Sequence, residues 1–249
     1  MLTKDTAICI RAVDYSETSQ IITFFTRANG KVSAIAKGSK RPKSAFDGPL
    51  EVFSYGKIIF SDSSREKLAI LTEFQQQPTL TSLSNNLFTL HCVPMAAELV
   101  NNLTDEYDPH PQLFDAFLQF LKNVNDIQDK HNASRDSLIL LILFQLTILN
   151  EVGLRPVLGR CANCKNNFHS DWPQTYFSHS VNGLICRDCE ASFPDRISLS
   201  GTAAETLSNL KMLSDVDEKT LNEVEKLLIN HFTEILHRPP KMSKYILKN

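Results

Sequence analysis

The sequence lacks a run of apolar residues long enough to cross a bilayer, which takes about 20 residues. Its most hydrophobic stretch, residues 138–149, is shorter than that and contains Gln145 and Thr147. No secretory signal is recognisable either, so we expect a chain that stays in a reducing compartment of the cell. At 249 residues and 42% hydrophobic content, the chain is long enough for two modest hydrophobic cores.

Signatures of catalysis are also missing. The sequence has no Walker-type phosphate loop, no GxGxxG that opens a helix, no HExxH and no GxSxG. The histidines are scattered one by one, and no paired carboxylates stand out beside them. These absences favour a binding protein over an enzyme.

Net charge is small, at −2, so the overall charge does not indicate a nucleic-acid binder. The distribution is more informative, because residues 18–46 contain no acidic residue. The basic residues of this segment form a candidate DNA-binding patch: Arg27, Lys31, Lys37, Lys40, Arg41 and Lys43. The alternative is a solvated loop that its lysines keep soluble. Phe24, Phe25 and Phe46 would stack on bases if exposed, but we expect them in the core.

Cysteine is scarce, and four of the six cysteines form two CxxC pairs in the sequences C-A-N-C and C-R-D-C. This spacing predicts one structural zinc ion per chain, bound by Cys161, Cys164, Cys186 and Cys189. Four sulfur ligands leave no open position for a substrate, which argues against a catalytic metal. Disulfides and a redox-active CxxC are the alternatives. Cys9 and Cys92 lie in apolar runs, where we expect them to pack as small hydrophobic side chains.

Residues 1–78 have the periodicity of β-strands. Residues 6–13 alternate between apolar and other side chains, and further β-rich runs cover residues 20–27, 31–37, 50–60 and 67–74. The dipeptide Asn29-Gly30 predicts a hairpin with a type I′ turn, in which both central residues have positive φ. Five short strands without a crossover helix predict a small closed barrel, with the OB-fold as the leading candidate.

Beyond Pro78 the apolar period becomes helical, so we expect residues 79–249 to form an α-helical domain. Its helices are predicted within residues 80–103, 113–121, 137–152, 202–213 and 221–237. A zinc loop at residues 157–195 is then an insertion that needs its metal to fold. The predicted fold class is α+β: an N-terminal OB-fold β-barrel followed by an α-helical domain with a four-cysteine zinc-binding insertion.

Three segments together resemble the bacterial RecO family of recombination mediators: K-G-S-K-R-P-K-S, L-G-R-C-A-N-C and Y-F-S-H-S-V-N-G-L-I-C-R-D-C. The resemblance spans essentially the whole chain. It implies a DNA repair protein of the RecF pathway that is not an enzyme, binds single- and double-stranded DNA and anneals complementary strands. It also implies that the protein helps to load RecA onto SSB-coated single strands with RecR. The implied partners are therefore DNA, RecR and the SSB C-terminal tail, with RecA indirect, in the bacterial cytoplasm beside the nucleoid.

The resemblance places the DNA contact on Lys37, Lys40, Arg41 and Lys43, with Arg27 and Lys31 as neighbours, and the metal on the four cysteines. In one place the sequence departs from the family pattern, because Asn182-Gly183 replaces a pair of glycines. We expect the turn to survive, since asparagine tolerates left-handed backbone. A second hypothesis is a zinc-stabilised adaptor that binds an acidic peptide and no DNA, and a zinc hydrolase is a third.

Overall fold

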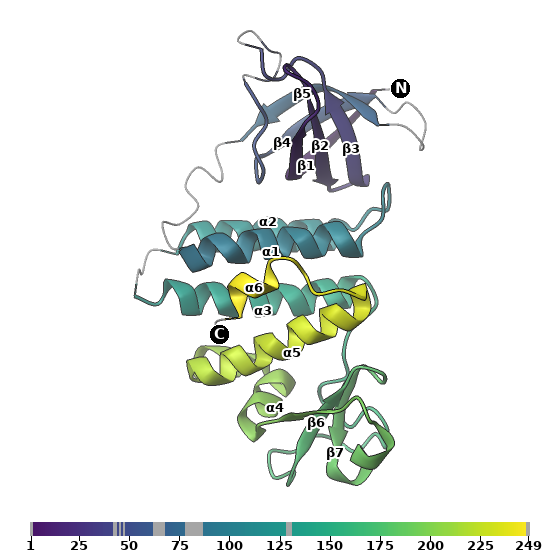
Figure 1. Ribbon diagram of the computed structural model, residues 1–249, viewed down its shortest axis with the longest axis vertical. Helices are drawn as coiled ribbons and strands as arrows, with labels where there is room; N and C mark the ends of the chain where they lie inside the picture. Colours follow the sequence, from purple (N-terminus) through teal and green to yellow (C-terminus); the bar gives the residue numbers. More distant parts are fainter. Residues whose placement is uncertain are drawn as a thin grey trace. The chain divides into compact units, whose positions relative to one another are not determined.

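The computed structural model describes residues 2–41, 44, 46, 48–61, 68–77, 87–127 and 131–247 (Figure 1). The chain forms two compact units. The first comprises Met1–Asn85 and Ala96–Asp126, and the second comprises Asn86–Met95 and Ile127–Asn249. The predicted boundary at residue 78 lies outside the described residues and stays a prediction.

The first unit contains a closed five-stranded barrel, which confirms the predicted fold (Figure 1). Its strands follow the order β1-β2-β3-β5-β4 around the barrel, and only β3 and β5 pair in parallel. Strand β1 is longer than predicted because its first half pairs with β4 and its second half with β2, with a register shift between Cys9 and Arg11. The strands are β1 (Leu2–Asp14), β2 (Gln20–Thr26), β3 (Gly30–Ala36), β4 (Tyr55–Ser61) and β5 (Ala69–Gln76).

Alternate residues of the strands fill the barrel, as the sequence pattern predicts. Phe24 lies in this core with its ring 5.9 Å from that of Phe74, and Phe46 packs in the same core. Phe25 is also fully buried, but it packs outside the barrel on Phe114, with ring centroids 5.9 Å apart. The expectation that these phenylalanines are buried is therefore confirmed.

The β2–β3 hairpin forms as predicted, but the prediction of a type I′ turn is wrong. Thr26 pairs with Gly30, so the turn has three residues, and of these positions only Gly30 has positive φ, at 69°. Asp5 explains the difference. Its carboxylate accepts hydrogen bonds from the backbone N–H groups of Ala28 and Asn29 and from the side-chain amide of Asn29. This anchor on β1 fixes a turn that the Asn-Gly dipeptide alone does not determine.

Two helices contribute to the first unit. Helix α1 (Leu87–Leu103) continues through Pro94, and the boundary between the units falls just after it, between Met95 and Ala96. Helix α2 (Pro111–Asn125) has the predicted amphipathic pattern. Its buried face includes Phe114, the partner of Phe25 on β2. The part of α1 from residue 96, the loop that follows and α2 therefore belong to the same compact body as the barrel.

The second unit is mainly helical, with α3 (Ala133–Glu151), α4 (Gly201–Ser208), α5 (Glu218–Leu236) and the short α6 (Ser243–Ile246). The helix predicted at residues 202–213 is divided, because the backbone leaves the helical region at Asn209 and resumes as the 3-10 helix η3 (Leu210–Ser214). Helix α3 is long and apolar enough to span a membrane by length and composition alone. Its buried face instead packs within the unit, where α3 contacts α5.

Candidate metal centre and basic surface

The cysteine pairs lie on two tight turns of a small β structure in the second unit. Strands β6 (Thr175–Ser178), β7 (Gly183–Cys186) and β8 (Ile197–Leu199) form a sheet of order β7-β6-β8. Cys161 and Cys164 lie on a turn closed by Lys165, whose φ is 68° and whose N–H donates to the Cys161 carbonyl. Cys186 ends β7, and Cys189 lies in the 3-10 helix η2 (Arg187–Ser192). Each pair thus places two sulfur atoms at one end of the sheet.

The four sulfur atoms lie within 4.8 Å of one another, and none of the described cysteines forms a disulfide. Cys164 Sγ and Cys186 Sγ are 3.8 Å apart. A tetrahedral zinc ion with bonds of about 2.3 Å to sulfur would separate its ligands by about 3.8 Å. The cluster therefore fits one tetrahedral ion, and its donor set suits a soft or borderline metal.

The surroundings favour a thiolate at Cys161, whereas burial raises the pKa of Cys186 to about 12. Burial raises the pKa of the Cys161 thiol, but hydrogen bonds from the backbone of Cys186, Cys164 and Asn163 outweigh it and bring that pKa to about 7. The side-chain amide of Asn163 also donates to Cys189 Sγ at 3.3 Å. Hydrogen bonds of this kind stabilise negative charge on sulfur, the form in which cysteine binds a metal.

The turn before the third cysteine survives the loss of a glycine, as expected. Asn182 has a left-handed φ of 47°, and its side-chain amide donates to the Leu154 carbonyl. Gly183 remains necessary for a different reason. A Cβ at this position would lie 2.7 Å from the carbonyl oxygen of Val157, so only glycine allows β7 and the segment at Val157 to approach this closely.

Three of the candidate DNA-binding residues lie together at one end of the β2–β3 hairpin. Lys37, Lys40 and Arg41 occupy the turn that follows β3. The backbone N–H of Lys40 donates to the Thr18 carbonyl, and its ammonium pairs with Asp14 at 2.6 Å. The loop between β1 and β2 and the basic turn are therefore held side by side. Lys43 lies outside the described residues.

Arg27 and Lys31 lie at the opposite end of the hairpin. Arg27 makes a bidentate contact with Asp115 of α2 at 2.9 and 2.8 Å. Lys31 donates to the carbonyls of Asn101 and Thr104, at 2.7 and 2.6 Å, where α1 ends. Burial lowers the pKa of the Lys31 ammonium. Arg27 is therefore paired with a carboxylate, and Lys31 with two backbone carbonyls, within the first unit.

The structure thus separates the candidate basic patch into two groups. Lys31 lies near the start of β3 and Lys37 directly follows its end, six residues later, which corresponds to about 20 Å at 3.3 Å per residue. Arg27 and Lys31 contact α2 and the end of α1. The other group, Lys37, Lys40 and Arg41, lies beside the β1–β2 loop. Sequence reasoning missed this division because it counts charge along the chain and does not show which end of the hairpin meets a helix.

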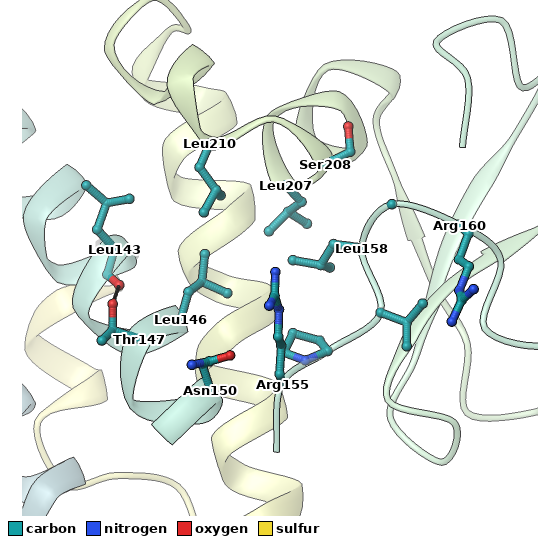
Figure 2. A pocket seen from close by; sticks show the side chains of 13 residues that line it. Leu143, Leu146, Thr147, Asn150, Arg155, Leu158, Arg160, Leu207, Ser208 and Leu210 are labelled. Carbon is teal, nitrogen blue, oxygen red and sulfur yellow. Dashed lines mark hydrogen bonds between the residues drawn. The ribbon is translucent and has the colours of Figure 1, made fainter. Parts of the chain in front are cut away.

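A pocket in the second unit also escaped the sequence reading (Figure 2). It has a volume of about 770 Å³ and lies between α3, α4, η3 and the segment that leads into the first cysteine pair. Leucines from all of these elements line it, including Leu146, Leu158 and Leu207. Figure 2 shows the guanidinium of Arg155 reaching up between Leu146 and Leu158. The pocket thus combines an apolar wall with two exposed cations, Arg155 and Arg160.

Comparison with known families settles the relationship of the chain. A family model described as "Recombination protein O N terminal" matches residues 1–77, and one described as "Recombination protein O C terminal" matches residues 84–244. The chain belongs to the RecO family. A DNA repair protein RecO from Bacillus pumilus and one from Bacillus subtilis are each 30% identical over 244 residues, covering 94% of this chain and 89% of theirs.

A third relative gives the same result. The DNA repair protein RecO of Rhodopirellula baltica is 30% identical over 216 residues, which are 87% of this chain and 77% of that protein. As a RecO family member, the chain is a DNA repair protein, and the barrel, the helical region and the cysteine cluster of its fold agree with the sequence prediction.

Proposed function

We propose that this RecO family protein is a recombination mediator that binds single- and double-stranded DNA, anneals complementary strands and, with RecR, helps to load RecA onto SSB-coated single strands. It does so by binding and positioning strands, without an enzymatic step, in the bacterial cytoplasm beside the nucleoid. The observation that supports this most directly is the exposed turn with Lys37, Lys40 and Arg41 at one end of an OB-type barrel.

Lys37, Lys40 and Arg41 carry the DNA contact in this proposal. Lys43, which lies outside the described residues, is a further member of this group. Lysine and arginine bind the phosphates of any sequence, which suits a protein that must act on many different strands. Arg27 and Lys31 are neighbours of the DNA contact in this proposal. Their own contacts hold the barrel to α2 and to the end of α1. Lys40 retains its role although it pairs with Asp14, because surface ion pairs are weak and exchange readily for a phosphate.

Binding of the full chain to a short labelled oligonucleotide across a salt series tests the proposal. Wild-type affinity should fall steeply with salt, with a slope of log affinity against log salt of about 0.7 for each phosphate neutralised on a single strand. A variant with Lys40→Glu and Arg41→Glu should bind more weakly and show a smaller slope. The matched control is Lys219→Glu with Lys226→Glu, which makes the same charge change at exposed positions of α5.

Two results would count against the proposal. Equal loss of affinity in both double variants would mean that net charge, and not the basic turn, governs binding. Absence of binding by the wild-type protein at low salt would remove the DNA contact altogether and leave a zinc-stabilised adaptor as the better description.

We further propose that the four-cysteine cluster binds one structural zinc ion. Cys161, Cys164, Cys186 and Cys189 would hold it, and the ion would link the turn before the small sheet to the end of β7. This role is supported by the size of the surrounding core, which consists of three of the cysteines and a few apolar side chains, Ala162 and Ile185 among the buried ones. So small a core supplies little hydrophobic stabilisation, so the metal supplies much of the folding free energy of this module.

The SSB C-terminal tail is the partner that we assign to the pocket of Figure 2. A peptide that ends there offers its terminal carboxylate to Arg155 and an apolar side chain to the leucines around it. A guanidinium pairs well with a carboxylate in a partly desolvated site. Charge and apolar surface in this pocket therefore complement the end of a peptide chain better than the middle of one.

A labelled peptide with the C-terminal sequence of SSB tests this assignment. Its affinity should fall by about 10-fold or more in the Arg155→Ala variant, because a charge-assisted hydrogen bond contributes roughly 1.5–3 kcal/mol. Amidation of the terminal carboxylate should weaken binding to wild type by a similar factor and have little further effect in the variant. Arg187→Ala, an exposed position outside the pocket, is the control. Unchanged binding after amidation would contradict the assignment.

A further inference from the structure

Two histidines meet where the cysteine module, which is the sheet β7-β6-β8 with its four cysteines, contacts α5. His179 lies in the turn between β6 and β7, and His231 lies on α5. Their Nδ1 atoms are 3.1 Å apart, their ring centroids are 5.4 Å apart, and the rings are tilted by only 14°. This centroid separation is close to the largest that Nδ1 atoms at such a distance allow, so each nitrogen points at the other. One N–H···N hydrogen bond therefore joins the turn to the helix.

The surroundings of the pair determine which ring donates. Phe177 lies across both rings, with centroids 5.4 Å from His179 and 5.3 Å from His231 and steep angles of 64° and 77°. His231 is 3% exposed, and its Nε2 has no partner among the described residues. A proton on that nitrogen would be a buried N–H without an acceptor, which is costly. Neutral His231 therefore carries its proton on Nδ1 and donates it to Nδ1 of His179.

This arrangement has no place for a further proton. On His231 it would occupy the buried Nε2, and on His179 it would occupy Nδ1, where it would face the N–H of His231. Burial lowers the pKa of both imidazoles, and the nearby His179 lowers that of His231 further, to about 4. Among the described residues, the charged groups that act on the pair are the carboxylates of Glu234 and Asp195, and both favour the charged form of His179. A protonated pair is thus better accommodated when the two rings separate.

The turn that carries His179 also supports one wall of the pocket in Figure 2. The Val157 N–H donates to the Asn182 carbonyl at 2.9 Å, and the Asn182 side-chain amide donates to the Leu154 carbonyl at 3.1 Å. Val157 is itself a lining residue of the pocket. The turn therefore connects α5, through the histidine pair, to the segment that forms the pocket wall.

We propose that the His179–His231 pair is a pH-sensitive switch, which holds the cysteine module on α5 while both imidazoles are neutral and, when protonated, releases the turn and loosens the pocket wall. The closed form is favoured above about pH 6.5 and loses that advantage as pH falls toward 4, because the separated rings take up protons that the closed pair excludes. One or two protons are gained on opening. The ratio of open to closed form should therefore rise about 10-fold to 100-fold between about pH 7.5 and about pH 5.5.

NMR of the imidazole nitrogens in the full chain with its metal tests the closed state. At about pH 7.5, His231 should be neutral, with its proton on Nδ1, and it should remain neutral at about pH 5.5 in the closed form. Hydrogen exchange at the Val157 amide, corrected for the intrinsic effect of pH on exchange, measures opening. Its metal content is followed in each sample, since acid also removes metal from thiolates. A proton on Nε2 of His231, or an ordinary pKa for this residue, would overturn the proposal.

The His231→Asn variant removes the titrating group, because its amide can donate from the position of Nδ1 and takes up no proton in this range. Its Val157 exchange should lose the 10-fold to 100-fold response to pH. His231→Phe fills the site more completely and should behave in the same way. The control is His169→Asn, an exposed histidine of the same module, which should respond as wild type does.

A wild-type response in both variants at position 231, or an equal loss of the response in His169→Asn, would overturn the assignment to this pair. If neither variant at position 231 folds, the tautomer and the titration of His231 in the wild-type protein decide the question.

Discussion

At the scale of single residues, two lysines at opposite ends of β3 show how position decides the use of a charge. Lys31 is half-buried and gives its ammonium to two backbone carbonyls at the end of α1. A cation at a helix C-terminus is stabilising, so the residue acts as a structural cap. Lys37, six residues later, lies beyond the strand and beside the β1–β2 loop. The same residue type is thus committed to folding at one end of the hairpin and is available for binding at the other.

In the second unit, the surroundings of a buried carboxyl group change its pKa. Glu225 on α5 is 1% exposed, and its Oε1 accepts a hydrogen bond from the Gln145 amide at 2.8 Å. Its other oxygen and the Gln145 carbonyl oxygen have no donor among the described residues. Burial raises the pKa of Glu225 to about 7, with the Gln145 hydrogen bond opposing it. Protonation of the carboxyl would remove the buried negative charge and supply a donor that the site lacks.

This arrangement predicts a pH-dependent stability. Because the folded-state pKa lies above the ordinary value of 4.5, the folded state retains a proton that the unfolded chain has lost. The contribution is therefore fully present below about pH 4.5 and is lost as pH rises through about 7. Glu225→Gln should lose this dependence and be more stable than wild type above about pH 7, by roughly 3 kcal/mol at most.

Urea unfolding of wild type and Glu225→Gln at a series of pH values measures the effect. The difference between the two free energies of unfolding isolates this group, since other titrating groups are common to both proteins. A difference that does not change with pH would show that Glu225 has an ordinary pKa in the folded protein.

At the scale of structural elements, the cysteine module predicts a local response to metal removal. A strong chelator should remove about one zinc ion per chain and lower the melting temperature, because metal binding supplies folding free energy to this module. Cys164→Ser should lower the metal content in the same way. Its thiol is the exposed member of the cluster, so the substitution disturbs packing little. Metal analysis and thermal unfolding are the measurements.

The control for metal removal is Cys92→Ala. This cysteine is fully buried in α1, and burial raises the pKa of its thiol, so it behaves as a hydrophobic side chain. The alanine variant should lose some stability but keep its full metal content. Loss of metal in this variant, or a chelator-treated protein with unchanged stability, would contradict a structural ion at the four cysteines.

The element scale also shows what the sequence predicts well. The spacing of the cysteine pairs is local, and so is the turn geometry that brings each pair together, which is why the cluster was predictable. The alternation of the strands predicted the barrel core for the same reason. The turn after β2 was predicted wrongly because Asp5, more than 20 residues away in the chain, holds it. The broken helix at Asn209 had no proline or glycine to mark it.

At the scale of the whole molecule, long-range contacts account for what the sequence could not predict. The division of the basic residues depends on Asp115 and on the carbonyls at the end of α1, each more than 60 residues from the hairpin. The pocket near Arg155 is assembled from residues as far apart in the sequence as Leu143 and Leu210. Charge counts and hydrophobic periods describe a segment and its own face. Neither identifies the distant segment that packs against that face.

Helix α1 has a consequence for how this protein can be divided or recombined. The first unit consists of two separate stretches of chain, and so does the second, so three cuts are needed to part them. The family models meet between residues 77 and 84, where a gene fusion between relatives would naturally be made. In such a hybrid, Phe25 and Lys31 of the barrel would come from one parent. Their partners, Phe114 of α2 and the carbonyls at the end of α1, would come from the other. Barrel and helices must therefore be inherited together, and a change at Phe25 or Lys31 in one lineage calls for a compensating change between residues 96 and 126.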